Sequence, residues 1–403
     1  MNVLFLTMSS GIDNFQSRGI YTDLMRKFRD EGHEVYLVFP RERRQGLTTG
    51  MRMHDGVHLL GVKTLNVTMT NIIEKGIGQV SIELLYKRAI KKYFKDVNFD
   101  LILYSTPPVT FSSVIKYAKK LNSSAKTYLL LKDIFPQNAV DMGMLSKNGV
   151  KGVLYEFFRA KEKKLYALSD YIGCMSPANV IYVLEHNPEI SKDRVEVAPN
   201  SLEFVEVEKS EDNTVLAKYN LPSDKPIFIY GGNLGAPQGI PFLIQCLDAN
   251  ACRDDCHFVV VGNGTYYQKL ADWYETAKPK SVTVLKGLPK VDYDRLVRSC
   301  HVGIIFLDYR FTIPNFPSRL LSYLECQMPV LCATDPISDV GPIAEENGFG
   351  FYIPSNDVDA FTQAVDKMLE SDRVAMGKTG YQFFKENYLI EHTYNQIMKH
   401  LTK

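Results

Sequence analysis

The chain has 403 residues, which is too long for one ordinary hydrophobic core and predicts two domains. Hydrophobic residues make up 45% and charged residues 23%, close to the globular average, which excludes a disordered or fibrous chain. The net charge of +1 conceals an asymmetry, because residues 1–200 carry 28 Lys and Arg against 20 Asp and Glu, and the remainder carries 19 against 26. A basic first half predicts an anionic partner.

The seven cysteines are odd in number, form no CxxC pair and lie mostly in the second half. This pattern is typical of reduced thiols in a cytosolic protein. Only Cys252, Cys256 and His257 resemble a metal-ligand cluster, and without a second ligand pair nearby we expect no metal. The start, MNVLFLTMSS, lacks the basic region of a signal peptide, and no apolar stretch reaches the roughly 18 residues of a membrane span. We therefore expect a cytoplasmic protein.

The first half of the chain alternates between strand and helix patterns. Short apolar runs predict strands at residues 3–7, 35–39, 101–104, 127–131, 171–175 and 195–197. Helical periodicity predicts helices at residues 21–28, 111–121 and 153–168. This alternation is typical of a doubly wound parallel sheet.

An acidic, polar segment interrupts the pattern at residues 200–224 and predicts a boundary between domains 1–202 and 203–403. Beyond it, apolar runs predict strands at residues 227–230, 258–261, 283–285, 302–306 and 330–333. A last helix, about residues 374–401, has no strand after it, and its end from about residue 381 could return to the first domain. We predict an α/β protein with two tandem Rossmann-like domains that face each other across a ligand cleft.

The clearest ligand signal is a glycine-rich loop that follows the predicted strand 227–230. Its candidate residues are Gly232, Asn233, Leu234, Gly235 and Gln238. Glycine lets the backbone approach a ligand closely, and free N–H groups at a helix start attract phosphate. The loop is not GxGxxG and no acidic residue follows at the dinucleotide spacing, which disfavours NAD. The alternative is a tight turn that binds nothing.

A second candidate is the helix start Pro317, Ser318 and Arg319. Proline suits a first helical turn, and arginine beside the positive helix end can pair with two phosphate oxygens. The alternative is an ordinary helix cap with a solvated arginine. Predicted strands at 302–306 and 330–333 flank this helix, so its start lies at the ligand edge of the sheet.

These motifs carry a family resemblance. The second half resembles the donor domain of glycosyltransferase family 4, of GT-B architecture, in YGGNLGAPQGIPFLI, FVVVGNGTYYQKL, VTVLKGLPKVDYDRLVRSCHVGII, FPSRLLSYLECQMPVLCATD and ENGFGFYIPSND. The first half is similar to bacterial transferases of O-antigen, capsule and exopolysaccharide synthesis, fucosaminyltransferase-like members included, in GHEV, DLILYSTPP, LLKDIFPQNAVDMGML, AKEKKLYALSDYIGCMSP and VAPNS. The resemblance covers almost the whole chain.

The resemblance implies a retaining transfer of a sugar from a nucleotide diphosphate sugar, with UDP expected and no obligatory metal or other cofactor. The base and ribose would lie near Lys286 and Leu288, with Gly262 also binding the donor. The diphosphate would sit between the glycine loop and Arg319, whose charge would stabilise the leaving group. Ser322 would hydrogen-bond a ribose or sugar hydroxyl.

Two family glutamates, eight positions apart, fall on Pro314 and Ser322, and neither is acidic. Glu325 lies one helical turn beyond Ser322, but we expect it to face elsewhere. The donor site therefore lacks the carboxylates that many family members carry.

The basic pair of the family's glycine loop falls on Asn233 and Gln238, which are uncharged. Arg319 therefore becomes the main candidate cation for the phosphates, with Arg310 as a second.

In the first domain, Asp133 follows the predicted strand 127–131 and could orient or deprotonate an acceptor hydroxyl. The alternative role is the N-cap of the next short helix. Arg18 and Gly19 close the first strand-to-helix loop, where the family brings backbone close to the donor diphosphate. Asn138 and Asn200 are weaker candidates for lining the site.

Residues 82–95 combine an apolar stripe at helical spacing with five basic residues. This pattern predicts an interfacial helix on an anionic membrane, and the lipid-linked acceptors of the family favour attachment to the inner face of the cell membrane. The alternative is a surface helix that packs on the first sheet and leaves its basic side in water. Nucleic acid is disfavoured, because the basic residues form no recognisable module.

We predict a bacterial glycosyltransferase that acts on a polyprenyl-linked or oligosaccharide acceptor in surface polysaccharide synthesis. One alternative is a noncatalytic partner subunit of a heteromeric transferase, which the missing glutamates and cations favour. A sugar-nucleotide epimerase on the same scaffold and a nicotinamide enzyme are further alternatives.

Overall fold

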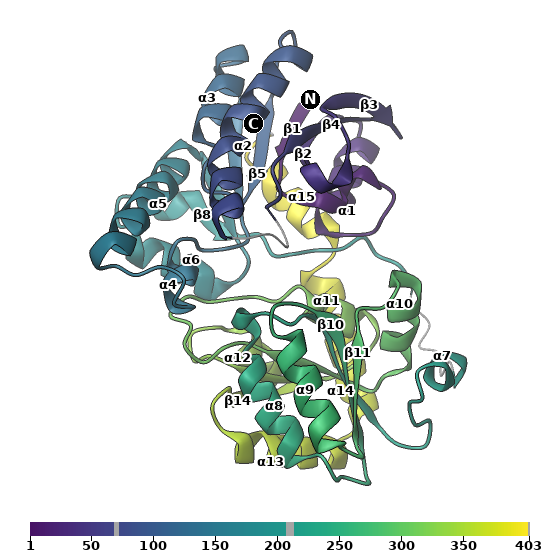
Figure 1. Ribbon diagram of the computed structural model, residues 1–403. Coiled ribbons are helices and arrows are strands. Elements are labelled where there is room, and N and C mark those ends of the chain that lie inside the picture. The colour runs from purple at the N-terminus through teal and green to yellow at the C-terminus, as the bar shows by residue number, and fades with distance from the viewer. Residues whose placement is uncertain (68–71, 207–212, 402–403) are drawn as a thin grey trace. The chain divides into compact units, whose positions relative to one another are not determined.

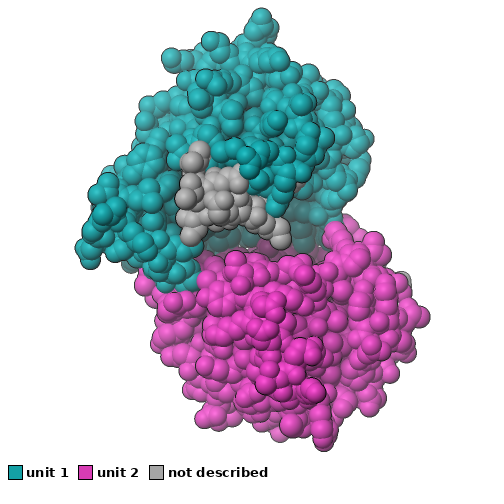
Figure 2. Space-filling model, viewed as in Figure 1, with its two compact units in different colours: residues 1–203, 389–403 teal, residues 204–388 magenta. Residues whose placement is uncertain are grey.

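The computed structural model describes residues 1–67, 72–206 and 213–401 and divides the chain into two compact units (Figures 1 and 2). Unit 1 comprises Met1–Glu203 and Leu389–Lys403, and unit 2 comprises Phe204–Tyr388. Each unit contains one sheet of mainly parallel strands with helices between them, so the predicted α/β class is confirmed. The sequence places the domain boundary after residue 202, and the unit boundary in the structure follows Glu203.

Unit 1 is built on an eight-stranded sheet of order β3-β4-β2-β1-β5-β6-β7-β8, in which only the β3–β4 pair is antiparallel. Its strands are β1 (Asn2–Leu6), β2 (Glu34–Glu42), β3 (Gly50–His54), β4 (Val57–Thr64), β5 (Leu101–Ser105), β6 (Lys126–Leu131), β7 (Tyr171–Cys174) and β8 (Val195–Val197). Its helices are α1 (Ile20–Asp30), α2 (Ile72–Tyr93), α3 (Ser112–Leu121), α4 (Gln137–Asp141), α5 (Gly149–Leu168), α6 (Pro177–His186) and α15 (Ile390–Met398), with 3-10 turns η1 (Ser10–Asp13), η2 (Arg43–Gln45) and η3 (Lys192–Arg194).

Unit 2 has a six-stranded parallel sheet of order β11-β10-β9-β12-β13-β14. Its strands are β9 (Ile227–Asn233), β10 (His257–Asn263), β11 (Val282–Lys286), β12 (Val302–Phe306), β13 (Val330–Thr334) and β14 (Gly350–Pro354). Its helices are α7 (Asn213–Lys218), α8 (Ile240–Ala249), α9 (Tyr267–Ala277), α10 (Lys290–Ser299), α11 (Arg319–Glu325), α12 (Val340–Glu346), α13 (Val358–Glu370) and α14 (Arg373–Asn387), with a 3-10 turn η4 (Ala236–Gln238).

The strand order of unit 2 is the doubly wound Rossmann order, in which the first strand lies in the middle and the chain then winds outward in both directions. The switch point lies between β9 and β12, and ligands of such sheets bind outside the carboxyl ends of the strands there. In unit 1 the corresponding switch point lies between β1 and β5. The order therefore selects the loops that follow these four strands as candidate binding loops.

The central strands are buried along their whole length, which explains their continuous apolar sequences. The segments LILYS of β5 and VGIIF of β12 have no exposed residue. Parallel strands covered by helices on both faces are uniformly apolar, whereas half-exposed strands alternate. The continuous runs in the sequence therefore predicted these strands reliably.

The end of the chain differs from the sequence prediction of one helix over residues 374–401. The helix breaks at Tyr388-Leu389, so that α14 belongs to unit 2 and α15 belongs to unit 1. Ile390 and Ile397 are buried in the same core cluster as β1, β2 and β5. The hydroxyl of Thr393 donates to Pro199 O at 3.2 Å and accepts a hydrogen bond from Ser201 Oγ at 2.8 Å. These contacts fix α15 as a structural part of unit 1.

The basic helix predicted at residues 82–95 forms the second half of α2. Its apolar stripe packs on the sheet: Ile82, Tyr86 and Ile90 are fully buried, and the Tyr86 hydroxyl donates to Thr7 O at 2.8 Å. This stripe is therefore part of the core and is not available to a membrane, as the alternative interpretation held. Among the described residues, no helix combines the length and hydropathy needed to cross a membrane.

We expect Ile397→Ala to lower the free energy of unfolding of unit 1 by about 2–5 kcal/mol, because it leaves a cavity in that core. The exposed neighbour Asn395 is the matched control, and Asn395→Ala should change stability by less than about 0.5 kcal/mol. Urea unfolding followed by circular dichroism reports both units, whereas the fluorescence of Trp273, the single tryptophan, reports unit 2. A larger shift in the fluorescence transition than in the dichroism transition would contradict the assignment of α15 to unit 1.

Candidate functional site

The glycine loop of unit 2 follows β9 at the switch point and presents its backbone at the sheet edge. Gly232 has a φ of +133°, which favours glycine over other residues. The neighbouring loop after β10 comes equally close, since a Cβ on Gly262 would lie 2.0 Å from Gly232 O. Leu234 N donates to Asn263 O at 2.8 Å and joins the two loops. The glycines therefore permit two strand ends to meet here.

The two uncharged loop positions, Asn233 and Gln238, bond to each other. Gln238 Oε1 accepts hydrogen bonds from Asn233 Nδ2 at 3.1 Å and from Gly235 N at 3.2 Å. The side-chain amides thus hold the loop in shape. At the two positions where the family resemblance implies a cationic pair, this chain has a neutral clamp, the hydrogen-bonded side chains of Asn233 and Gln238.

Arg319 lies against this loop. Its guanidinium carbon is 4.4 Å from the centroid of the Tyr230 ring, a cation–π distance. Its Nη1 atom is buried and has no hydrogen-bond partner among the described residues, and no described carboxylate pairs with it. A guanidinium stays charged at any ordinary pH. The site therefore contains a positive charge that the protein itself leaves without a counter-ion.

Two tyrosines that the sequence analysis did not single out hold this arrangement. The Tyr323 hydroxyl accepts from Gly231 N at 3.1 Å and donates to Ile229 O at 3.2 Å, which ties α11 to β9. Tyr230 supplies the ring below Arg319, and its hydroxyl donates to Asn233 O at 2.8 Å. In the sequence, only the position of Tyr230 directly before Gly231 and Gly232 could have pointed to its role in the site.

The helix start at Pro317 and Ser318 is less pronounced than predicted. Helix α11 has seven residues, and the exposed Ser318 makes no side-chain capping bond. The segment before α11 is attached to the loop that follows β13. Asn315 N donates to Ser338 Oγ at 2.8 Å, and Ser338 Oγ in turn donates to Asp335 Oδ2 at 2.8 Å. These loop contacts and Tyr323 therefore position Arg319, and the short helix α11 adds little through its dipole.

Arg310, the second candidate cation, is already paired. Its Nε and Nη2 atoms lie 2.8 and 2.9 Å from the two carboxylate oxygens of Asp308. Burial alone would raise the pKa of Asp308, but the hydrogen bonds from Arg310 lower it below its usual value. Arg310 therefore brings no unbalanced charge to the site.

The remaining residues predicted to bind the donor lie at the same edge of the sheet. Lys286 ends β11, and its Nζ atom is 5.6 Å from the centroid of the Tyr267 ring. Leu288 follows in the same loop and is half-buried, as is Ser322 on α11. Glu325 is buried, so it does not offer a carboxylate to a ligand at the surface.

In unit 1, the structure brings Asp133 and Asn138 together. Asn138 Nδ2 donates to Asp133 Oδ1 at 2.6 Å, and the Thr106 hydroxyl bonds to the backbone of Asp133 from the end of β5. The N-cap of α4 is Pro136, so the alternative role of Asp133 as that cap is not realised. Hydrogen bonds from Thr106 and Asn138 therefore hold Asp133 where the ends of β5 and β6 meet.

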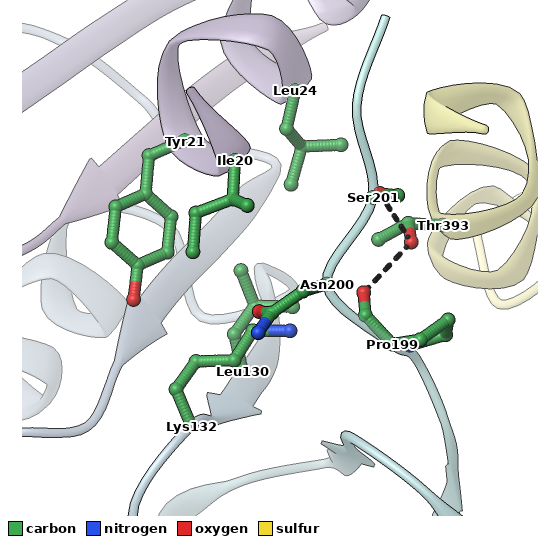
Figure 3. A pocket seen from close by; sticks show the side chains of 9 residues that line it. All are labelled: Ile20, Tyr21, Leu24, Leu130, Lys132, Pro199, Asn200, Ser201 and Thr393. Atoms are coloured by element: carbon green, nitrogen blue, oxygen red, sulfur yellow. Dashed lines mark hydrogen bonds between the residues drawn. The ribbon is translucent and has the colours of Figure 1, made fainter. Parts of the chain in front are cut away.

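A small pocket beside Asp133 contains a lysine that the sequence analysis did not select. Lys132, Tyr21 and Asn200 line it, and Figure 3 shows the ends of Lys132 and Asn200 turned toward each other. The pocket volume is about 10 Å³, roughly the room for one water molecule, so it positions side chains and holds no sugar. Lys132 directly precedes Asp133 after a buried strand, which was the available signal.

Burial lowers the pKa of Lys132 to about 7, with a small opposing effect of the nearby Cys174 thiol. Lys132 Nζ donates to Ala198 O at 3.1 Å. Asn200 is buried, and its Oδ1 atom has no hydrogen-bond partner among the described residues. Burial also raises the pKa of Tyr21 to about 12. These groups form a polar cluster that is neutral or singly charged near pH 7.

Arg18 and Gly19 are engaged within unit 1. Gly19 N donates to Asp23 Oδ1 at 2.8 Å, and Arg18 bonds to the carbonyl oxygen of Glu203. The backbone N–H that the resemblance offered to a diphosphate is thus occupied by a carboxylate. In this structure the loop before α1 bonds to Asp23 of α1 and to Glu203.

In the cysteine and histidine group of unit 2, Cys252 is exposed whereas Cys256 and His257 are buried. His257 Nε2 lies 2.8 Å from Thr283 Oγ1, and burial lowers its pKa to about 4. Across residues 1–67, 72–206 and 213–401, no three His, Cys, Asp or Glu side chains are arranged to hold a metal ion.

Known proteins resemble this chain in sequence. The family model described as Glycosyl transferases group 1 matches residues 211–383, nearly all of unit 2. A protein of Pseudomonas aeruginosa named as a probable glycosyltransferase, WbjE, is 22% identical over 332 residues, which cover 79% of this chain and 77% of WbjE. The chain is a glycosyltransferase.

Solved structures place this glycosyltransferase in the GT-B fold. Sucrose-phosphate synthase of Thermosynechococcus elongatus aligns with a TM-score of 0.75 at 14% identity, covering 99% of this chain and 98% of that one. HepE of Anabaena, solved in complex with UDP and glucose, aligns with a TM-score of 0.70 at 13% identity, covering 100% and 99%. WcaI of Escherichia coli strain K12, whose name assigns it to colanic acid biosynthesis, is 22% identical over 280 residues, 67% of this chain and 66% of WcaI.

We expect the stability of unit 1 to rise between about pH 7 and pH 10, because the folded chain releases the Lys132 proton near pH 7 whereas an unfolded lysine keeps it until about pH 10.4. Lys132→Met should remove this contribution. Urea unfolding at a series of pH values measures it, and Lys120→Met, at an exposed lysine, is the control. An unchanged pH dependence in Lys132→Met would refute the assignment.

Proposed function

We propose that this glycosyltransferase transfers a sugar from a UDP-sugar, with retention of configuration, to a lipid-linked or oligosaccharide acceptor of bacterial surface polysaccharide synthesis. The observation that carries the proposal is the buried, unpartnered Nη1 atom of Arg319 at the ligand edge of unit 2. Assignment to family 4 and to its fucosaminyltransferase-like subgroup stays a prediction from the resemblance.

A diphosphate fits Arg319 for an electrostatic reason. A buried guanidinium nitrogen without a hydrogen-bond partner costs free energy, and an anion that accepts two guanidinium hydrogen bonds would offset that cost. As the glycosidic bond to the nucleotide breaks, negative charge grows on the diphosphate, and a fixed cation stabilises it without reorganisation. Since Arg310 is paired and Asn233 is neutral, most of this stabilisation would come from Arg319. We expect the reaction to need no obligatory metal.

The choice of UDP is supported by the fold neighbour HepE, which was solved with UDP and glucose. The names of WbjE and WcaI support a glycosyl transfer in bacteria, and that of WcaI supports a role in polysaccharide synthesis. Both relatives align over about two thirds or more of this chain. The particular sugar is set by contacts that none of these similarities identifies.

On the acceptor side, we propose that Asp133 orients or deprotonates the attacking hydroxyl. Its carboxylate accepts a hydrogen bond from Asn138 Nδ2 at 2.6 Å, and the Thr106 hydroxyl bonds to its backbone, so the carboxylate has a defined position at the carboxyl ends of β5 and β6. Lys132 beside it, with its pKa near 7, can change the charge of this cluster within the physiological range. General-base assistance of this kind contributes about 10²- to 10⁴-fold to a rate.

The noncatalytic partner subunit is the second candidate. It is favoured by the neutral clamp of Asn233 and Gln238, which stands where the resemblance expects cations. A partner subunit of this kind would bind a nucleotide weakly or not at all and would transfer no sugar alone.

We expect Arg319→Ala to weaken UDP binding by at least about 30-fold, because the guanidinium makes charge-assisted hydrogen bonds worth roughly 1.5–3 kcal/mol each. Arg319→Lys should recover part of the affinity, since it keeps the charge but not the fork. Isothermal calorimetry with UDP measures the effect. Arg310→Ala is the matched control and should change affinity by less than about threefold, because Asp308 already pairs with that guanidinium. Equal losses in both variants would contradict the site.

We expect Asp133→Asn to lower kcat at least about 100-fold with little change in the affinity for UDP. The assay follows UDP release from UDP-glucose and UDP-N-acetylglucosamine in the presence of undecaprenyl-linked acceptors. Asp141→Asn, nearby on α4, is the control. A loss of UDP affinity in Asp133→Asn, with an unchanged kcat, would overturn its acceptor role, and no turnover by the wild type with any donor and acceptor would favour the partner subunit.

A further inference from the structure

The side chain of Tyr293, on α10, fills the space that Gly231 leaves open at the end of β9. A Cβ on Gly231 would lie 2.0 Å from Tyr293 Oη and 2.7 Å from Tyr293 Cζ. On the next residue, a Cβ on Gly232 would lie 3.3 Å from Arg319 Nη2. The two adjacent glycines therefore make room for a phenol hydroxyl and for the guanidinium.

Tyr293 and Arg319 lie close enough for their charges to interact. Burial raises the pKa of Tyr293 to about 12, and the positive charge of Arg319 opposes part of that rise. The phenol therefore keeps its proton near neutral pH and remains able to donate a hydrogen bond. Tyr293 thus adds an O–H donor beside a guanidinium whose buried Nη1 atom has no partner among the described residues.

Three tyrosines interact with the charge of Arg319, and they differ in what their hydroxyls bond to. The hydroxyls of Tyr230 and Tyr323 donate to backbone carbonyl oxygens, at 2.8 and 3.2 Å. The half-buried Tyr293 hydroxyl makes no hydrogen bond within the part of the chain that the structure describes. Of the three, Tyr293 is therefore the one whose proton is not committed to the protein.

The end of β9 thus brings two hydrogen-bond donors together without an acceptor for them. Neither the guanidinium nitrogen of Arg319 nor the hydroxyl of Tyr293 has a partner among the described residues. Donors shielded from water cost free energy unless an acceptor meets them. The group that satisfies both donors carries negative charge and several acceptor oxygens close together, as a diphosphate does.

The position of Tyr293 in the chain agrees with a contact to a nucleotide. Helix α10 begins at Lys290, and the loop before it contains Lys286 and Leu288, which the family resemblance assigns to the base and ribose. Tyr293 lies in the first turn of this helix. A nucleotide with its base at that loop and its phosphates at Arg319 would pass the Tyr293 hydroxyl.

We propose that Tyr293 contacts the donor directly and that its hydroxyl donates a hydrogen bond to the diphosphate that Arg319 binds. This inference rests on the proposed UDP-sugar donor and adds a residue to its site. As the bond between sugar and diphosphate breaks, negative charge grows on the diphosphate, and the hydrogen bond from the phenol strengthens. The proton stays on Tyr293 throughout. The hydroxyl thereby supplies part of the stabilisation that the neutral residues Asn233 and Gln238 do not give.

The test is isothermal calorimetry of UDP with the wild type, Tyr293→Phe and Arg319→Ala. We expect Tyr293→Phe to weaken UDP binding about 10- to 100-fold, the range of a hydrogen bond to a charged group. Uridine, which lacks phosphate, should bind to Tyr293→Phe as it binds to the wild type, and saturation-transfer NMR measures this weaker binding. In the UDP-release assay, Tyr293→Phe should also lower kcat, because the lost hydrogen bond strengthens as charge develops.

A double-mutant cycle tests whether both side chains bind one diphosphate. The loss of UDP affinity caused by Tyr293→Phe should be smaller when Arg319 is already alanine, since residues that share a partner are not additive. Tyr274→Phe is the matched control, because Tyr274 is a half-buried tyrosine two turns beyond Tyr267 on α9. It should leave the affinity for UDP and the kcat unchanged. Thermal unfolding checks that every variant is folded.

The possible failures are distinguishable. If Tyr293→Phe binds UDP as tightly as the wild type while Arg319→Ala loses affinity, the inference is overturned and the proposed donor stands. Equal losses for UDP and uridine also overturn it, because the hydroxyl would then contact the nucleoside and not the diphosphate. A wild type that binds no UDP overturns both proposals.

Discussion

The cation–π contact between Arg319 and Tyr230 is the interaction on which the rest of the donor site depends. It holds a permanent charge against the end of β9 without an acidic partner, so the charge stays available to a ligand. Aromatic faces stabilise a cation less than a carboxylate does, and that weaker stabilisation is what leaves the guanidinium able to pair with an anion. An aspartate at the position of Tyr230 would bind the arginine more firmly and abolish its use.

The surrounding parts keep that contact in place. Tyr323 ties α11 to the backbone of β9, and the serine hydroxyl of Ser338 holds the segment before Arg319. The neutral pair Asn233 and Gln238 fixes the glycine loop without adding charge. At the glycine loop, the positive charge among the described residues is that of Arg319, where the resemblance to related transferases suggested a further basic pair.

In unit 1, burial changes the protonation of a lysine beside the candidate acceptor carboxylate. Lys132 is held among uncharged groups, which shifts its pKa toward neutrality, while Asp133 beside it is fixed by Asn138 and Thr106. A carboxylate next to a lysine that titrates near pH 7 makes the local charge sensitive to small changes of environment. On the outside of the same unit, α5 separates its buried aromatic side from an exposed apolar and basic one.

Local sequence patterns predict the two α/β units, the strands of continuous apolar residues and the glycine loop, because buried parallel strands and tight strand-to-helix turns leave such patterns. They also select Arg319 and Asp133. Three features are visible only in the folded protein: Asp308 neutralises Arg310, Tyr230 and Tyr323 hold Arg319, and α15 returns to unit 1. The contact of Tyr230 with Arg319 and the packing of α15 join residues distant in the chain, and the ion pair of Asp308 with Arg310 depends on how their loop folds, so periodicity reveals none of them. The same limit explains the two basic amphipathic helices, since only packing shows that α2 buries its apolar stripe and α5 exposes one.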